Sequence, residues 1–511
     1  MRTRSRLFAL AAGALALAAP LFAAPEPRAL KDLPALEGLP ERWEGVMDLF
    51  DVPGMGVAVV KDGRIYAQGF GKRDQGMSKP VTPDTMFYVA SVTKTFNAVG
   101  VLRLIGEGKL SLSDPVQKRL PAFALPDSET AARLTIDDML SFRQGIMCDP
   151  AANMESLTGE ITDARFWHWM QGVAQPSTPR YSNIPFSVLG RVIGAVSGKA
   201  WKQYLIDEVA RPAGLTRVTT SIATMEADPD HADPLQRDRK TGAWSLVTAR
   251  KTDATMHAAG GMAMSAADGG RWLRVLLAGG NADGKQVAPE ALVRAMTDMH
   301  ARFEKPRGAI RIGRGFGYAW EVGTFNDHRY ASRGGDFPGW AAACVMLPDH
   351  NAGFIVLMNS GELASGMRDV VSIDLLERIT GTRNPKGDIL EQYAAQLRKT
   401  KETGDWSGFP PQPGAPDRLA GASLSLPPAK YAGEYRHPMI GTLRVRVVDG
   451  ALEFAFGQWA VDAKGEDAVQ DAFSITSIAD GTAKASFVIE GGVVKGVTVT
   501  EPALGMLNFT R

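Results

Sequence analysis

A serine and a lysine three residues apart form the sharpest chemical feature of the sequence. Ser91 and Lys94 are the first and last residues of the only Ser-x-x-Lys motif in the chain. Apolar residues recur at helical spacing over residues 91–106, and side chains three apart on a helix share one face. A lysine can remove the proton of a serine hydroxyl when burial or a nearby cation lowers its pKa. The pair is a candidate nucleophile and base, although an N-cap serine before a surface lysine has the same spacing.

Two further segments carry polar groups suited to the same reaction. Tyr181-Ser182-Asn183 is the only Tyr-x-Asn and precedes an apolar helical stretch. A tyrosine hydroxyl can pass a proton to or from a lysine, and an asparagine can hydrogen-bond a substrate amide. The segment 332–340 places Arg333 beside Gly334 and Gly335 between two apolar runs. There an arginine could hold a substrate carboxylate, whereas a buried aromatic and a tight turn are the structural alternatives for these two segments.

The elements that must position these residues are those of an α/β domain. Residues 54–71 contain two β-rich runs joined at Asp62-Gly63, a signal for a type I′ hairpin. A mostly helical subdomain is predicted over 120–300. Strands are expected over 317–322, 330–333, 340–347 and 353–358, followed by a helix over 363–379.

The remaining chain divides into a linker and a small β domain. Residues 404–428 are crowded with Pro, Gly and Ser, and 430–511 show short alternating runs with a second hairpin signal at Asp449-Gly450. We predict a signal peptide over 1–23, a hydrolase domain over 24–383, a linker over 384–428 and a small all-β barrel over 429–511.

Composition excludes several classes of protein. The 511 residues carry 57 basic and 56 acidic side chains without a charged block, so nucleic acid is a poor candidate partner. None of the seven histidines forms an H-x-H or HExxH array, and no G-x-S-x-G is present. We expect no metal and no cofactor. Cys148 and Cys344 are predicted to be separate thiols, although a disulfide is the alternative.

The N-terminus indicates export. Arg2, Arg4 and Arg6 precede an apolar run over 7–17, and Ala23 and Ala24 offer a cleavage point. An uncleaved anchor is the alternative. With cleavage, we expect a periplasmic or secreted protein without a stable membrane span.

The order of these motifs resembles the serine β-lactamase and penicillin-binding-protein superfamily, especially the class C β-lactamase, family VIII esterase and D-aminopeptidase branch. Further segments shared with that branch lie at 53–60, 87–90, 134–140, 187–190, 211–215 and 258–268. The resemblance covers roughly residues 44–380 and implies an antiparallel sheet flanked by helices plus a mostly helical subdomain. The tail, with segments 431–435 and 441–445, resembles the lipocalin-like domain appended to such hydrolases.

The resemblance implies a role for each motif residue. Ser91 would be the acylated nucleophile, Lys94 its base and Tyr181 the proton shuttle. Asn183, Arg333 and Gly335 would contact substrate, and the backbone N–H groups of Ser91 and Asp336 would form the oxyanion hole. Two departures are present. Arg333 stands where the family has lysine or histidine, and residues 141–145 lack the His and Ser of the family's THxSG segment.

The sequence therefore predicts an exported serine hydrolase that opens an ester, amide or β-lactam bond through an acyl-Ser91 intermediate. An esterase or a D-amino-acid peptidase fits best, with a small molecule or peptide as substrate. The altered third motif supports one alternative, a catalytically degenerate protein that binds cell-wall peptide or a β-lactam. Another makes the β domain the functional module. The sequence leaves the oligomeric state open.

Overall fold

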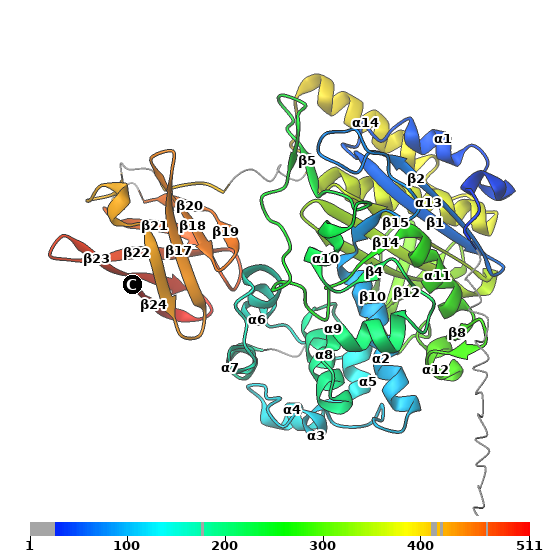
Figure 1. The fold of residues 1–511 in the computed structure, drawn as a ribbon, viewed down its shortest axis with the longest axis horizontal. Coiled ribbons are helices and arrows are strands. Elements are labelled where there is room, and N and C mark those ends of the chain that lie inside the picture. The colour runs from blue at the N-terminus through cyan, green and yellow to red at the C-terminus, as the bar shows by residue number, and fades with distance from the viewer. Residues whose placement is uncertain (1–25, 175–177, 410–415, 420–422, 467–468) are drawn as a thin grey trace, which may run out of the picture.

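The fold is known from a computed structural model that describes residues 26–174, 178–409, 416–419, 423–466 and 469–511. The predicted signal peptide lies outside these residues. Figure 1 shows an α/β body and, beside it, a β domain that ends at the C-terminus. No helix in the described ranges is long and apolar enough to cross a membrane.

An eight-stranded antiparallel sheet forms the centre of the α/β body, in the order β10-β11-β12-β13-β14-β15-β1-β2. Its strands are β1 (Gly54–Lys61), β2 (Arg64–Gly71), β10 (Ala301–Arg307), β11 (Arg311–Phe316), β12 (Glu321–Phe325), β13 (His328–Phe337), β14 (Trp340–Leu347) and β15 (Ala352–Met358). The predicted hairpin between β1 and β2 is confirmed, with positive φ at Asp62 and Gly63. One strand prediction is wrong. Residues 317–320 form the turn between β11 and β12, in which the Gly317 N–H donates to the Trp320 carbonyl at 2.9 Å and Ala319 has a φ of 70°.

Helices bury both faces of this sheet. Helix α11 (Ala266–Leu277) packs on β1, β2 and β15, and α13 (Glu362–Thr380) packs on β14 and β15. Alternation in β1 matches the two layers, since Val57 and Val59 belong to the core beneath α13 while Ala58 and Val60 belong to the core beneath α11. Helix α14 (Ile389–Thr403) packs on α13, and α1 (Leu39–Glu44) contributes Trp43 to the same layer.

A mostly helical subdomain adjoins the sheet, as predicted. Helix α2 (Thr93–Gly106) runs through its centre and is buried on nearly every side, which is typical of a core helix. Its other helices are α3 (Val116–Arg119), α4 (Ser128–Arg133), α5 (Ile136–Leu140), α6 (Asp149–Asn153), α7 (Asp163–Val173), α8 (Ile184–Ser197), α9 (Trp201–Tyr204), α10 (Ile222–Ala227) and α12 (Glu290–Ala295). Short strands complete it, namely β3 (Met86–Tyr88), β4 (Val218–Thr219), β5 (Leu235–Arg237), β6 (Trp244–Leu246), β7 (Ala263–Ser265), β8 (Asn281–Ala282) and β9 (Lys285–Gln286).

The C-terminal domain is a nine-stranded antiparallel sheet in the order β19-β18-β17-β16-β24-β23-β22-β21-β20. Its strands are β16 (Gly433–His437), β17 (Gly441–Val448), β18 (Ala451–Phe456), β19 (Trp459–Val461), β20 (Ala463–Gly465), β21 (Ala472–Thr476), β22 (Thr482–Glu490), β23 (Val493–Glu501) and β24 (Gly505–Thr510). The two edge strands, β19 and β20, follow each other in sequence, so the sheet curls into a nearly closed barrel. Phe454, Phe473 and Phe487 pack together inside it. The predicted small β barrel is confirmed.

The barrel contacts the helical subdomain through specific hydrogen bonds. Trp169 on α7 donates to the carbonyl of Met439, and Asn153 on α6 donates to that of Ile478. Figure 1 shows the barrel beside α6 and α7. The two cysteines are free and buried, one in the loop before α6 and one in β14, which confirms the prediction of separate thiols.

Candidate active site

Ser91 lies in a tight turn at the entrance to α2. A 3-10 turn, Ala90–Val92, joins β3 to the helix, and Ala90 has a left-handed φ of 44°. Such a conformation costs about 1 kcal/mol or more for a residue with a Cβ and persists only where its surroundings hold it. Thr93 supplies that support, because its hydroxyl donates to the Ala90 carbonyl at 2.7 Å and accepts from the Met262 N–H at 3.0 Å.

Lys94 is fully buried one helical turn from Ser91. Its Nζ lies 3.0 Å from Ser91 Oγ, 2.7 Å from the Tyr181 hydroxyl, 2.8 Å from Asn183 Oδ1 and 2.7 Å from the carbonyl oxygen of Ala259. An ammonium has three protons, one fewer than these four oxygens. A neutral amine, with two protons and one lone pair, also makes three contacts, by donating to Asn183 and Ala259 and accepting from one hydroxyl.

Electrostatics shifts Lys94 toward that neutral form. Burial lowers the pKa of Lys94 to about 8, and the charge of Arg333 acts in the same direction, against the opposing effect of Tyr181. Lys94 thus has the lowered pKa that a general base needs near neutral pH.

Tyr181 joins the nucleophile and the amine. Its hydroxyl lies 2.6 Å from Ser91 Oγ, so Ser91, Lys94 and Tyr181 form a closed triangle of hydrogen bonds. Burial acts to raise the pKa of Tyr181, but the charges of Lys94 and Arg333 outweigh it and the net shift is downward. The loop that carries Tyr181 ends at α8, where the Ser182 hydroxyl accepts the N–H of Ile184.

Arg333 lies behind this triangle. Its side chain is 6% exposed, and its guanidinium carbon lies 5.0 Å from the Tyr181 ring centroid and 5.4 Å from that of Phe142. Nε donates to the Ala319 carbonyl, while Nη2 is buried without a hydrogen-bond partner in the described parts of the chain. Burial lowers the pKa of Arg333, yet a guanidinium stays protonated. The site therefore holds a permanent positive charge.

Gly335 brings β13 against the nucleophile turn. A Cβ at this position would lie 2.4 Å from the Val89 carbonyl oxygen and 3.1 Å from the Ser91 nitrogen. The neighbouring Asp336 is anchored through its carboxylate to Ser365 and Arg368 on α13. Close packing on one side and the anchor on the other fix this end of β13 beside Ser91.

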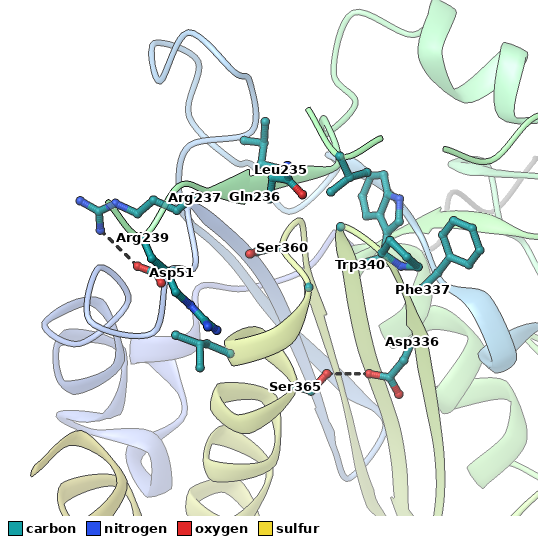
Figure 2. Close-up of a pocket in the computed structure, with 15 residues that line it drawn as sticks. Asp51, Leu235, Gln236, Arg237, Arg239, Asp336, Phe337, Trp340, Ser360 and Ser365 are labelled. Atoms are coloured by element: carbon teal, nitrogen blue, oxygen red, sulfur yellow. Dashed lines mark hydrogen bonds and ion pairs between the residues drawn. The ribbon is translucent and has the colours of Figure 1, made fainter. Parts of the chain in front are cut away.

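A cavity of about 390 Å³ begins at the same end of β13. Figure 2 shows Asp336, Phe337 and Trp340 on one side of it and Leu235 and Arg237 on the other, with the hydrogen bond from Ser365 to Asp336 at its edge. Most of its lining is apolar. Ser91, Lys94 and Tyr181 do not line this cavity, so it borders the end of β13 and not the nucleophile itself.

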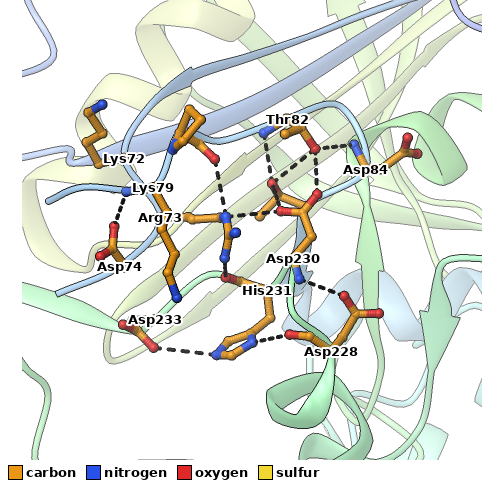
Figure 3. A network of polar contacts seen from close by, with 12 residues as sticks. Lys72, Arg73, Asp74, Lys79, Thr82, Asp84, Asp228, Asp230, His231 and Asp233 are labelled. Carbon is orange, nitrogen blue, oxygen red and sulfur yellow. Dashed lines mark hydrogen bonds and ion pairs between the residues drawn. The ribbon is translucent and has the colours of Figure 1, made fainter. Parts of the chain in front are cut away.

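A polar network holds β3, the strand that leads to Ser91 (Figure 3). The Asp230 carboxylate accepts from Thr82 at 2.7 Å and from Thr85 at 2.6 Å, and pairs with Arg73 at 3.1 Å. Beside it, the Met86 N–H donates to the Asp230 carbonyl at 2.9 Å. The network fixes the entrance to the nucleophile turn from the side opposite β13.

The structure brings all the predicted site residues together at one place. It also adds two that sequence reasoning missed. The carbonyl of Ala259 contacts Lys94, and Phe142 packs 5.5 Å from the Tyr181 ring. A backbone carbonyl leaves no signal in residue type. Phe142 lies in the segment noted only for lacking the family's His and Ser, and its φ of 54° marks a sharp turn there.

Comparison with known proteins agrees with this geometry. The profile of the family described as Beta-lactamase matches residues 44–376. The chain belongs to the beta-lactamase family. In this beta-lactamase family member the matched range contains every site residue described above.

Individual relatives are distant. Penicillin-binding protein 4 of Amycolatopsis lactamdurans is 28% identical over 358 residues, which is 68% of this chain and 91% of that protein. An octameric penicillin-binding protein homologue from Pyrococcus abyssi has a TM-score of 0.58 at 20% identity, covering 93% of this chain and 100% of that one. The D-amino acid amidase of Ochrobactrum anthropi, with a TM-score of 0.54 and 20% identity, covers 67% of this chain and 97% of its own. At such identities the two structures establish the fold alone.

Proposed function

We propose that the protein is an exported serine hydrolase that opens an ester or amide bond through an acyl-Ser91 intermediate. One observation carries this proposal. The Lys94 amine, kept buried and easily neutralised, lies within hydrogen-bond distance of both the Ser91 hydroxyl and the Tyr181 hydroxyl. A surface lysine beside a capping serine would have neither feature.

In acylation, Ser91 Oγ attacks the substrate carbonyl carbon. The new bond is Oγ–C, the bond that breaks joins that carbon to the leaving group, and the hydroxyl proton passes to neutral Lys94. Tyr181, which contacts both groups, returns a proton to the leaving oxygen or nitrogen. In deacylation a water molecule forms a new O–C bond to the acyl carbon and the Oγ–C bond breaks. The water proton passes through the same pair to Ser91 Oγ, and the carboxylic acid is released.

The backbone N–H groups of Ser91 and Asp336 are the proposed oxyanion donors. The close approach of Gly335 to the Ser91 nitrogen supports this role, since it brings the backbone of β13 next to the backbone of the nucleophile turn. Preorganised donors of this kind each contribute about a hundred- to a thousandfold in rate.

Substrate recognition is proposed to use Asn183 and Arg333. Asn183 Oδ1 accepts from Lys94, which leaves its amide NH₂ to donate to a substrate carbonyl. Arg333 supplies a positive charge that attracts a substrate carboxylate through the site, since its guanidinium itself is buried. This arrangement suits an ester or a D-amino-acid amide or peptide, and one protein of similar fold is a D-amino acid amidase.

Covalent labelling tests the proposal. The purified protein should form an adduct on Ser91 with a fluorophosphonate, and Ser91→Ala should form none. Labelling by the fluorophosphonate but not by a fluorescent penicillin would select the esterase or peptidase reading. If folded protein reacts with neither reagent, the protein is a binding protein and the acyl-enzyme mechanism is wrong.

Export has its own measurement. Expression with the native N-terminus should give an intact mass that corresponds to loss of the first 23 or so residues, consistent with the basic and apolar character of that segment. An unprocessed mass in the membrane fraction would instead identify an anchor.

A further inference from the structure

We propose that Lys251 is a positioning residue for β13, the oxyanion strand, which carries the proposed oxyanion donor Asp336. We further propose that the C-terminal barrel holds Lys251 in place through Gln458. The inference rests on the proposed function for its kinetic consequence. Its structural basis is a chain of contacts that runs from the barrel to the residue after Asp336.

Lys251 is a second buried amine close to the site. It is 5% exposed, and its Nζ donates to the Ser156 carbonyl at 2.6 Å and approaches the Thr255 carbonyl at 3.4 Å. Within the described residues no carboxylate forms an ion pair with it at 4.0 Å or less. Burial lowers the pKa of Lys251 to about 7, against the opposing charge of Glu155. Burying an amine in this way is costly, so its retention calls for a compensating role.

The Lys251 amine contacts an aromatic side chain of the oxyanion strand. Lys251 Nζ lies 4.1 Å from the ring centroid of Phe337, which follows Asp336 directly in β13. The Phe337 ring meets that of Tyr88 edge-to-face at 5.9 Å. Tyr88 in turn donates to the Gly260 carbonyl, next to the Ala259 carbonyl that contacts Lys94. Lys251 thus touches Phe337 of β13, which in turn contacts Tyr88 of β3, the strand that precedes the nucleophile turn.

The barrel forms hydrogen bonds with both segments that Lys251 connects, the turn Met154–Thr158 and the segment that follows Lys251. Gln458, in the turn between β18 and β19, donates its N–H to the Thr158 carbonyl at 3.0 Å, and its Oε1 accepts from the Thr252 hydroxyl. Thr158 and Ser156 belong to one π-helical turn, Met154–Thr158, while Thr252 follows Lys251. Gln458 and Lys251 therefore cross-link the same two segments. Loss of the Gln458 side chain should leave the Lys251 segment less firmly anchored to the π-helical turn.

Kinetics provide the first test. Lys251→Met keeps an apolar chain over Phe337 but removes the hydrogen bonds, and Gln458→Ala removes the barrel's side-chain contact. Each should lower kcat by about three- to thirtyfold while KM changes little, because the site is misplaced without losing a substrate contact. If Gln458 acts through Lys251, the double variant should match Lys251→Met alone. Multiplying effects would overturn the coupling.

The matched control is Arg165→Ala. Arg165 Nε donates to the Pro438 carbonyl at 2.9 Å and Nη1 to the Glu160 carbonyl at 2.6 Å, so this variant breaks a barrel contact that involves none of Gln458, Thr252 and Lys251. It should leave kcat unchanged. An equal loss of activity in Arg165→Ala and Gln458→Ala would show that barrel docking in general, and not the Lys251 chain, governs the site.

Hydrogen exchange reads the inference without any substrate. In Gln458→Ala, amides of residues 251–256 and 334–340 should exchange faster than in the parent, whereas those in Arg165→Ala should not. Thr252→Val, which removes the same hydrogen bond from the hydrolase side, should reproduce the change and guards against misfolding of one variant. Unchanged exchange in both segments overturns the inference, and failure of Ser91 to label concerns the proposed function alone.

Discussion

At the scale of single residues, the protonation of Lys94 decides the pH range of the reaction. The base must be neutral to accept the Ser91 proton, and burial lowers its pKa to about 8. We expect kcat/KM to rise about tenfold per pH unit below pH 8 and to level off above it. A pH profile with an activated ester, corrected for its spontaneous hydrolysis, measures this. A profile that falls through pH 8 would contradict the assignment of Lys94 as base.

Arg333 should set the position of that limb. Its positive charge contributes to the lowered pKa of Lys94, so Arg333→Met should move the rising limb to higher pH. Arg329→Met is the control, because Arg329 lies on the same strand but forms an exposed ion pair with Asp349. The same profiles test both variants, and an unmoved limb in Arg333→Met would remove Arg333 from the electrostatics of the base.

Residue types and spacing marked Ser91, Lys94 and Tyr181 as candidates and the family resemblance supplied their roles, but neither predicted their surroundings. Ser91, Lys94 and Tyr181 carry functional groups with recognisable spacing, and the structure places them in contact. The sequence could not predict the contact from Ala259, because any residue supplies a carbonyl. Nor could it predict Lys251, whose burial depends on a strand and a π-helical turn that are distant in the chain.

At the scale of elements, the approach of β13 to the nucleophile turn should tolerate no side chain. Gly335→Ala would place a Cβ 2.4 Å from the Val89 carbonyl oxygen and push the strand away from Ser91. We expect the rate of Ser91 acylation to fall about a hundredfold, as when an oxyanion donor is lost.

Gly334→Ala is the matched control for this change. The nearest atom to its new Cβ would be 3.8 Å away, an ordinary contact. Rates of labelling by a fluorophosphonate, compared at equal folded fraction, distinguish the two. Similar rates for both variants would show that β13 has no part in stabilising the oxyanion.

Elements were predictable where local chemistry dominates. Asp62-Gly63 and Asp449-Gly450 favour positive φ, and both turns adopt it. The strand expected over 317–322 was wrong over 317–320, because apolar residue type cannot reveal that the Tyr318 N–H donates outside the sheet, to the Met296 carbonyl. That constraint comes from a segment packed against it in three dimensions.

At the scale of the whole molecule, one of the contacts that dock the barrel is a close backbone approach at Gly457. Gly457 has a φ of 57°, and a Cβ there would lie 2.4 Å from the Thr158 carbonyl oxygen. We expect Gly457→Ala to release the barrel, so that calorimetry resolves two thermal transitions in place of one.

Gly450→Ala provides the reference for backbone strain. Its φ of 80° carries a similar cost of about 1 kcal/mol, but no atom lies within 4 Å of the added Cβ. It should lower the barrel's melting temperature without separating the domains. Identical melting curves for the two variants would contradict a docking role for Gly457.

The two buried thiols, Cys148 and Cys344, can report local opening of the structure through their reactivity. Burial raises the pKa of Cys148 to about 12 and that of Cys344 further still, so neither reacts as a thiolate in the closed protein. Cys148 borders a cavity shared with Ala479 and Asp480 of the barrel, whereas Cys344 lies in the middle of β14. A maleimide time course therefore gives two labelling rates. The rate at Cys148 reports opening of the interface between the domains, and the rate at Cys344 reports opening of the central sheet.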